Sequence, residues 1–350
     1  MARIVFADDG IMFDGGTPEK SPLGGVESSV VDLVEELASR GHEVLVRNMC
    51  AEPLLHKGVD WGPIHGDRPY SNMPLEADLY VANRGEKLID LMPYAKRTVF
   101  WVHNPANFLL KWRYLKKLWK VRPAIIFIGN YHMTTYPKWA PCGDRIVIPY
   151  GIPKLFRTAN PSLKIPAPRA VFTSNPLRSL DWLLDQWRDK IQPRVPGAEL
   201  HVFSGSATYG SVGDVKSKVM QKVLDQAQAL AEKGVVLRGP VPKAQLLEEF
   251  REARVLLYRG DLNETFCLAV GEAQAMGVPS VVEDLGSMSE RVIHGKTGFV
   301  VNGKKNFSIS ACNLLTDDDL WQTQHNAALK LQRRWGWPDA AREFEKLIPQ

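Results

Sequence analysis

Short, fully apolar runs alternate with amphipathic helical patterns from one end of this chain to the other. Twelve of these runs predict strands, at residues 4–7, 43–46, 79–82, 98–102, 124–128, 146–149, 170–173, 199–203, 235–238, 254–258, 280–282 and 298–301. Nearly all of them are apolar at every position, as strands are when a parallel sheet is covered on both faces. Because helical patterns fill the gaps, the sequence predicts an α/β fold with parallel sheets.

A proline-rich stretch divides the chain into two halves. Four prolines lie between residues 153 and 168, where they disfavour both a helix and a central strand. We therefore predict an N-terminal Rossmann-like domain at residues 1–155, a linker at 156–168 and a second Rossmann-like domain from residue 169 to 334. At 350 residues the chain is long enough for two such cores.

Composition and charge indicate the cellular location and the kinds of partner to expect. No apolar run approaches the length of a membrane span, and residues 2–6 read as a first strand rather than as a signal peptide. The four cysteines are scattered with no Cys-x-x-Cys pair, which favours reduced thiols, no zinc site and a cytoplasmic location. A net charge of +5 permits anionic partners without requiring them.

Two glutamates eight residues apart carry the strongest functional signal. Residues 254–258 predict a strand, a polar loop follows, and the pattern is helical from about residue 266 to 276. Glu264 then lies in the loop and Glu272 two turns inside the helix. Free N–H groups at a helix start suit a phosphate, and a carboxylate on each side suits the hydroxyls of a nucleotide-sugar. The alternative is that both are solvated acids on a helix surface.

The surrounding sequence resembles a known family. The segments Glu264-Thr-Phe-Cys-Leu, Glu272-Ala-Gln-Ala-Met-Gly-Val-Pro-Ser-Val-Val and Gly295-Lys-Thr-Gly-Phe-Val-Val resemble the donor-binding half of retaining family 4 glycosyltransferases, the glycosyl transferases group 1. The resemblance covers roughly residues 170 to 302. It implies the GT-B fold, with two Rossmann-like domains whose parallel sheets face a central cleft. Residues 335–350 resemble the crossover helix that returns to the first domain of such enzymes.

The resemblance also implies roles for donor-binding residues. Glu272 would bind the ribose hydroxyls, and Glu264 would face the donor sugar. In similar enzymes two cations of the loop after residues 170–173 hold the diphosphate, and here only Arg178 matches. The remaining donor-binding candidates are Asn175 near the place of the missing cation, the turn Ser204–Gly205, the Val241 amide at the base, and the amides of Thr265 and Phe266 over the distal phosphate.

Three places in the first half contain candidate residues for binding the donor sugar or the acceptor. Gly24 and Gly25 end an unusually long loop, and they are similar to the glycines that close over the donor in this family. His103 follows the strand at residues 98–102, where ligands of parallel sheets bind, and the resemblance implies that it contacts the transferred sugar and stabilises developing charge. Candidate acceptor contacts at the same rim are Arg84, Asn104 and Asn130.

Residues 109–122 form a strongly basic segment with two tryptophans and no acid. At helical spacing its inward residues would be Leu110, Tyr114, Leu115, Leu118 and Val121. The ordinary interpretation is a solvated helix face packed on its own domain. The alternative is a surface for an anionic acceptor or for peripheral contact with the inner face of an anionic membrane. We expect no nucleic-acid binding, because no base-stacking motif accompanies these charges.

The function predicted from these residues is a retaining, metal-independent glycosyl transfer from a nucleotide-diphosphate sugar to a carbohydrate or lipid-linked hydroxyl. The first half of the sequence has no Asp-x-Asp metal signature, and no cofactor motif stands out, so we expect no metal and no cofactor besides the donor. Two alternatives remain open. One is a nucleotide-sugar 2-epimerase or hydrolase of double-Rossmann type, which lacks the Glu-Thr-Phe…Glu-Ala arrangement. The other is a catalytically silent nucleotide-sugar-binding subunit, which the incomplete phosphate clamp favours.

Overall fold

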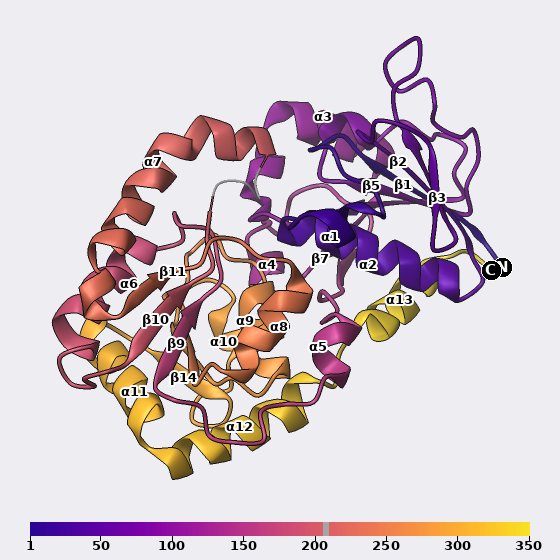
Figure 1. Cartoon of the computed structure of the whole chain (residues 1–350). Helices are drawn as coiled ribbons and strands as arrows, with labels where there is room; N and C mark the ends of the chain where they lie inside the picture. Colours follow the sequence, from indigo (N-terminus) through magenta and orange to yellow (C-terminus); the bar gives the residue numbers. More distant parts are fainter. Residues whose placement is uncertain (206–209) are drawn as a thin grey trace. The chain divides into compact units, whose positions relative to one another are not determined.

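The computed structural model describes residues 1–205 and 210–350 of the chain. These residues form two compact units (Figure 1). The first contains Met1–Lys20, Gly25–Gly151 and Trp337–Gln350, and the second contains Ser21–Gly24 and Ile152–Gly336. The division thus falls at Gly151, just before the proline-rich stretch, and the C-terminal segment lies in the first unit from Trp337 onward.

The first unit contains one sheet, which has eight strands among the described residues. Its order is β3-β4-β2-β1-β5-β6-β7-β8, and every neighbouring pair is parallel except β3 with β4. The bounds are β1 (Arg3–Asp8), β2 (Glu43–Asn48), β3 (Leu54–His56), β4 (Val59–Pro63), β5 (Leu79–Asn83), β6 (Arg97–Trp101), β7 (Ala124–Phe127) and β8 (Arg145–Val147). All six strands predicted in this half are present, with ends that differ by a few residues.

The hairpin β3–β4 is an addition that the strand prediction missed. Its two-residue turn is Lys57–Gly58, and both residues have positive φ, 45° and 80°. Positive φ at both central positions is the geometry of a type I′ turn, which matches the twist of a hairpin. Short apolar groups on either side of Lys57–Gly58 could have indicated this hairpin. They are too short to show the alternation of apolar and polar residues that is typical of a strand.

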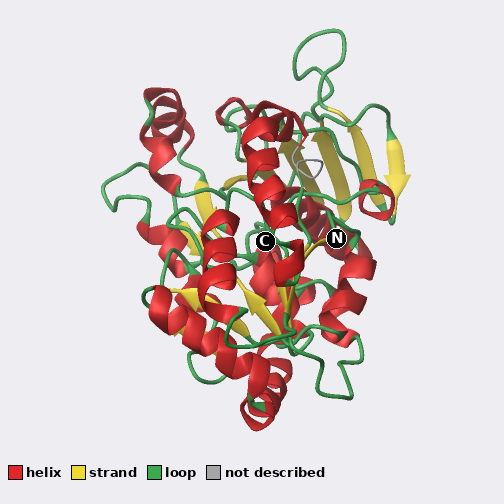
Figure 2. Cartoon of the chain, turned by 60° about the vertical axis from the view of Figure 1, so that its left-hand side comes forward, coloured by secondary structure: helices red, strands yellow, loops and turns green. Residues whose placement is uncertain are grey.

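Helices pack against the sheet of the first unit (Figure 2). They are α1 (Thr17–Lys20), α2 (Gly25–Ser39), η1 (Glu86–Leu88), η2 (Ala106–Leu110), α3 (Trp112–Val121), α4 (Asn130–Thr134) and α13 (Trp337–Glu345). The C-terminal α13 is fixed by apolar and charged contacts. The Phe344 ring lies 5.3 Å from the Trp101 ring between centroids, and Glu345 accepts two hydrogen bonds of 2.7 Å from Arg40.

The second unit also holds one sheet, six-stranded within the part of the chain that is described, with order β11-β10-β9-β12-β13-β14. All of its pairs are parallel. The strands are β9 (Arg169–Phe172), β10 (Glu199–Val202), β11 (Val235–Leu237), β12 (Val255–Leu257), β13 (Ser280–Glu283) and β14 (Gly298–Val301). Two parallel sheets in two units confirm the α/β class and the Rossmann-like units that the sequence predicts.

Helices of the second unit connect these strands. They are α5 (Lys154–Thr158), α6 (Leu180–Gln186), η3 (Trp187–Ile191), α7 (Gly210–Ala229), η5 (Ala231–Lys233), α8 (Lys243–Arg251), α9 (Leu268–Ala275), α10 (Met288–Arg291), α11 (Lys304–Thr316) and α12 (Asp318–Gln332). None of the helices in the described ranges has the length and hydropathy required to cross a membrane.

Helix α9 begins two residues later than predicted. Cys267 takes a left-handed conformation, with φ of 65° and ψ of 80°, and this interrupts the helix before Leu268. Glu272 consequently lies about one turn inside the helix rather than two. Residues with a Cβ seldom adopt this conformation, so the chain places a strained residue at the start of α9.

Candidate active site

In the second unit, four predicted donor loops meet at the carboxyl ends of neighbouring strands. Ser204, after β10, donates a 2.5 Å hydrogen bond from its hydroxyl to the Ser174 carbonyl after β9. A Cβ added to Gly205 would lie 2.8 Å from Pro240 in the loop after β11. The loop after β12 contacts the loop after β9 through Asp261, which pairs with Arg178. This is the sheet edge at which parallel α/β folds bind ligands.

Arg178 links the first and last of these loops. Its guanidinium lies 3.2 Å from the Asp261 carboxylate, and its side chain remains about one-third exposed at 32%. Burial alone would lower the pKa of Arg178, but the nearby groups of Glu264, Tyr258 and Asp261 raise it. Arg178 is therefore a permanently charged group that still has surface available for an anion.

Asn175 shapes the same loop. Its side-chain oxygen accepts a 2.8 Å hydrogen bond from the backbone N–H of Leu177, which forms an Asx turn. Its carbonyl also accepts from the N–H of Arg178 at 2.9 Å. Asn175 thus holds the turn that presents Arg178, at the place where similar enzymes have a cation.

Glu264 precedes α9 and is oriented by a tyrosine. The hydroxyl of Tyr258, at the end of β12, donates a 2.7 Å hydrogen bond to Glu264 Oε2. Burial and the charge of Glu264 raise the pKa of Tyr258 well above its usual range, so the phenol stays protonated as a donor. Between Glu264 and α9, Thr265 and Phe266 are buried. Glu264 thus stands at the entrance to the helix start.

Glu272 is buried in α9 and is paired with a lysine that the sequence did not single out. Its Oε1 lies 2.8 Å from Nζ of Lys243, the first residue of α8. Lys243 follows the Val241 loop by two residues, so this ion pair brings the predicted base-reading loop to the predicted ribose carboxylate. No local sequence pattern indicates this pair, because α8 and α9 are separated by a strand and two loops.

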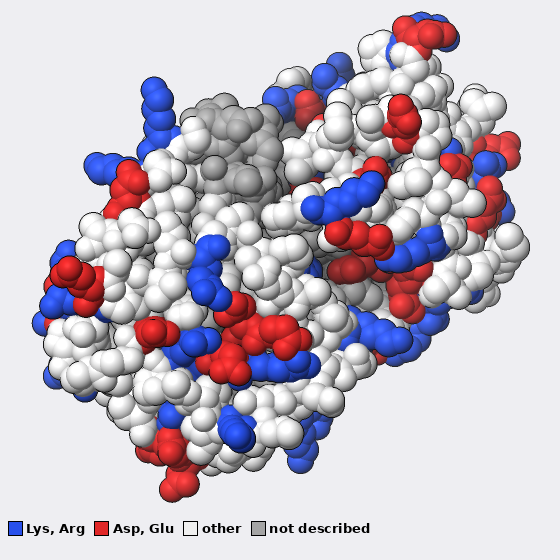
Figure 3. All heavy atoms as spheres, viewed as in Figure 1, with Lys and Arg blue, Asp and Glu red and all other residues white. Residues whose placement is uncertain are grey.

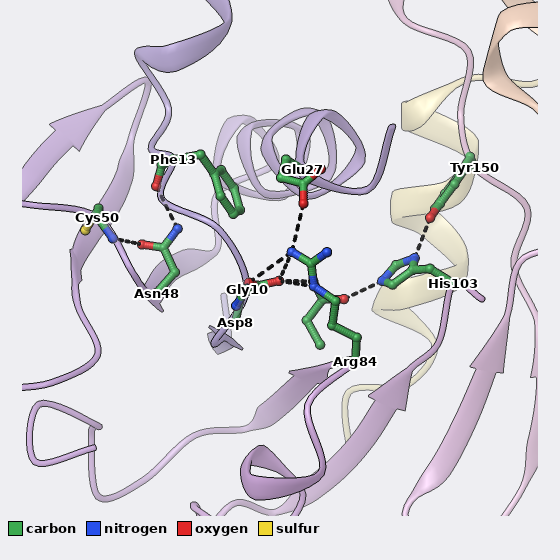
Figure 4. Close-up of polar contacts among 10 residues, drawn as sticks. Asp8, Gly10, Phe13, Glu27, Asn48, Cys50, Arg84, His103 and Tyr150 are labelled. Atoms are coloured by element: carbon green, nitrogen blue, oxygen red, sulfur yellow. Dashed lines mark hydrogen bonds and ion pairs between the residues drawn. The ribbon is translucent and has the colours of Figure 1, made fainter. Parts of the chain in front are cut away.

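In the first unit a polar cluster occupies the corresponding sheet edge (Figure 4). Arg84, just after β5, has a positive φ of 57°. Its guanidinium donates to Asp8 of β1 at 3.2 and 3.1 Å and to Glu27 of α2 at 2.9 Å. Burial would lower the pKa of Arg84, but Asp8 and Glu27 outweigh it and raise it. Arg84, predicted as an acceptor contact, is therefore committed to two carboxylates that join β1, β5 and α2.

His103 lies beside this cluster, buried beyond the end of β6. Its ring contacts the Tyr150 hydroxyl through Nδ1 and the Asn83 side-chain oxygen through Nε2. Its ring centroid is 4.7 Å from that of Trp101. Burial, followed by the charge of Arg84, holds the pKa of His103 well below its usual range. The neutral imidazole is thus the stable form.

The other predicted residues of the first half lie at the ends of helices and loops. Gly25 is the first residue of α2, so the Gly24–Gly25 pair leads directly into the helix that carries Glu27. Asn104 and Asn130 are exposed. The Asn104 carbonyl lies 2.8 Å from Nε2 of His132, and this buried histidine has a pKa lowered to about 4 by desolvation.

The basic segment 109–122 divides into the end of η2 and the helix α3. Tyr114 and Leu118 are buried, as predicted, while Leu110, Leu115 and Val121 are half-buried. Trp112 and Trp119 are 68% and 49% exposed, and their rings lie 6.0 Å apart in an edge contact. On the face shown in Figure 3, basic and acidic side chains are interspersed, without one large field of a single sign.

Comparison with known proteins agrees with this geometry. Residues 167–317 match the family model for glycosyl transferases group 1. The D-inositol 3-phosphate glycosyltransferase of Thermobispora bispora is 30% identical over 130 residues, which are 35% of this chain and 30% of that protein. The Streptomyces coelicolor protein of the same name is 31% identical over 168 residues, 47% of this chain and 34% of that protein. This chain thus spans about a third of the length of these curated relatives.

Solved structures share the fold over almost the whole chain. Sucrose-phosphate synthase from Thermosynechococcus elongatus has a TM-score of 0.75 at 16% identity, covering 99% of this chain and 98% of that one. Anabaena HepE in complex with UDP-glucose also has a TM-score of 0.75 at 16% identity, covering 99% of both chains. The fold is therefore of the GT-B type, and the match to the glycosyl transferases group 1 model lies in the second unit, at residues 167–317.

Proposed function

We propose that this chain transfers a sugar from a nucleotide-diphosphate sugar to an acceptor hydroxyl, with retention of anomeric configuration and without a metal. The observation that carries the proposal is the arrangement around α9. Glu264 precedes the helix start, Glu272 lies one turn inside it, and Arg178 stands beside Glu264 as a charged group with free surface. Hydroxyls suit the two carboxylates, and a diphosphate suits the arginine and the helix N–H groups.

The chemistry follows from this placement. The diphosphate leaves with the electron pair of its bond to the anomeric carbon, and Arg178 with the α9 amides stabilises the charge that develops. The acceptor oxygen attacks the same face of the oxocarbenium-like sugar. One oxygen of the leaving diphosphate takes the acceptor proton, so no protein nucleophile is needed. Glu264 orients the sugar, and Glu272 holds the ribose.

Product analysis tests this directly. Purified protein is incubated with a panel of nucleotide-diphosphate sugars and candidate acceptors in the presence of EDTA, and the anomeric proton of the product is followed by NMR. We expect release of nucleoside diphosphate and a product with the anomeric configuration of the donor. An inverted product, or transfer that requires added metal, overturns the retaining, metal-independent mechanism. Nucleotide binding without turnover on any acceptor would favour the silent binding subunit instead.

We also propose that α3 and its flanking residues bring the chain to an anionic membrane or a lipid-linked acceptor. The exposed pair Trp112 and Trp119 lies among lysines, and the segment 109–122 has no acidic residue. Tryptophan rings favour the membrane interface, and lysines favour anionic headgroups. Lys117 is paired with Asp90 at 2.5 Å, so the exposed Lys116 and Lys120 are the better residues to test.

Liposome co-sedimentation tests the membrane contact. Wild-type protein should pellet with vesicles containing anionic lipid and not with neutral vesicles, and the double variant Lys116→Glu/Lys120→Glu should stay in solution. The matched control is Lys305→Glu/Lys330→Glu, which makes the same change of charge at exposed positions of the second unit. Equal pelleting of both variants, or none by the wild type at low salt, contradicts the proposal.

A further inference from the structure

The hydrogen bonds around His103 form a chain whose direction is fixed at one end. Asp8 accepts from the Arg84 guanidinium at 3.2 and 3.1 Å, so its carboxylate presents only acceptor oxygens. The side chain of Asn83 contacts Asp8 Oδ2 through its NH2 group. The amide oxygen of Asn83 therefore faces the other way, toward Nε2 of His103.

An amide oxygen can only accept a hydrogen bond, so Nε2 of His103 must carry the proton. In a neutral imidazole the other nitrogen, Nδ1, is then an acceptor, and the Tyr150 hydroxyl donates to it. We propose that Asp8, Asn83 and Tyr150 are positioning residues that fix His103 as the neutral tautomer protonated on Nε2. Its effect on turnover rests on the proposed function, whereas the tautomer does not.

The surroundings of the ring oppose protonation from every side. His103 is 4% exposed, and Tyr150 stacks on it with a centroid distance of 5.8 Å and an interplanar angle of 26°. The nearby titratable groups are Arg84 and His132, whose positive charges disfavour a second proton, while the charges of Asp8 and Glu27 are taken up by Arg84.

The fixed tautomer of His103 limits which groups can take the proton of the acceptor hydroxyl. With Nε2–H donated to Asn83 and Nδ1 engaged by Tyr150, the His103 ring does not act as a general base. Its role is to anchor the segment His103–Asn104 at the end of β6, next to α4, which begins at Asn130. This agrees with the proposed mechanism, in which the acceptor proton passes to the leaving diphosphate.

Long-range ¹H–¹⁵N NMR of uniformly ¹⁵N-labelled protein tests the tautomer without any substrate. We expect the His103 ring to show a protonated Nε2 and an unprotonated Nδ1, with shifts that stay constant from about pH 5.5 to 8. A proton on Nδ1, or titration of the ring within that range, overturns the proposal. His103→Gln identifies the resonances.

Two variants test the positioning role. Tyr150→Phe removes only the hydroxyl, so it should move the Nδ1 shift and lower kcat about tenfold while the donor KM is unchanged. Asn83→Asp places a second carboxylate at Nε2–H, so the His103 ring should begin to titrate in the neutral range. Tyr94→Phe, at an exposed tyrosine of the same unit, is the matched control and should change neither quantity.

The outcomes separate this inference from the proposed function. If the wild-type ring has the expected tautomer but no nucleotide sugar is turned over, the proposed function fails and the tautomer assignment stands. If turnover is present and Tyr150→Phe retains both kcat and the Nδ1 shift, the positioning role of Tyr150 is wrong.

Discussion

The two sheet edges of this molecule use their charges in opposite ways. In the first unit, Arg84 is held by Asp8 and Glu27, and both nitrogens of His103 are engaged inside the same cluster. In the second unit, Arg178, Glu264 and Glu272 each have one strong protein partner and further capacity to bind. The first edge is fixed in advance, and we propose that the second receives charge and hydroxyls from a ligand. That contrast predicts where substitutions change binding and where they change stability.

The largest effect is expected at Arg178, because it would stabilise charge that develops only in the transition state. Arg178→Ala should lower kcat by roughly 100- to 1000-fold, about 2.7–4 kcal/mol, with a smaller effect on donor affinity. Steady-state kinetics with the preferred donor measures this. Arg188→Ala, at an exposed arginine paired with Asp185 and Asp189, is the control and should leave kcat unchanged. If both variants have wild-type turnover, Arg178 is not at the reacting bond.

Glu272 should act on binding rather than on turnover. Glu272→Ala removes the proposed acceptor for the ribose hydroxyls together with the 2.8 Å ion pair to Lys243, so donor affinity should fall on the order of 30-fold, about 2 kcal/mol. Isothermal titration calorimetry with the nucleoside diphosphate measures the change. Glu232→Ala, at an exposed acid of the same unit, should bind like the wild type. Equal affinities for all three proteins would place the ribose elsewhere.

The free energy of unfolding should depend on pH through the buried His132 at the sheet edge of the first unit. Burial lowers the pKa of His132 to about 4, below the value near 6.5 expected in the unfolded chain. The unfolded chain therefore binds the proton more readily, and the stabilisation present above about pH 6.5 is lost as the pH falls toward 4. Between pH 6.5 and 5 the His132 contribution is roughly 2 kcal/mol.

Urea unfolding of the wild type and of His132→Gln across this range measures that contribution. The variant should lose less stability than the wild type between pH 6.5 and 5. Parallel curves for the two proteins would mean that His132 is not buried in its neutral form.

The smallest effect is expected at Lys243. Lys243→Met leaves the buried Glu272 without its cation, which should reduce the free energy of unfolding by about 1–2 kcal/mol, less than a fully buried pair because Lys243 is 33% exposed. The double variant Lys243→Met/Glu272→Leu should recover most of that loss, since it removes the unpaired charge. Thermal unfolding at neutral pH measures the stability of both variants. If the double variant is also unstable, the loss of stability comes from altered packing rather than from the unpaired charge.

Sequence alone predicted the elements but not the pairings between them. Fully apolar strands are visible because burial on both faces leaves a continuous apolar run, and all twelve predicted strands are present. The hairpin at Lys57–Gly58 was missed because its strands are short. Glu264 and Glu272 stood out because local spacing and family resemblance agree on them.

The side chains that these residues contact could not be predicted from the sequence. Tyr258 with Glu264, and Lys243 with Glu272, are set by how neighbouring βα units pack, which no local pattern encodes. The same holds for Tyr150 at His103, which comes from the far end of the first unit's sheet. For Arg84 the sequence indicated the correct sheet edge, but only the structure shows that two carboxylates occupy its guanidinium.

A crystal structure of the protein with a nucleoside diphosphate bound tests the donor site around α9 most directly. We expect the distal phosphate at the start of α9, within hydrogen-bond distance of Arg178, and the ribose hydroxyls on the Glu272 carboxylate. A nucleotide bound away from α9, or with its ribose turned away from Glu272, would contradict it.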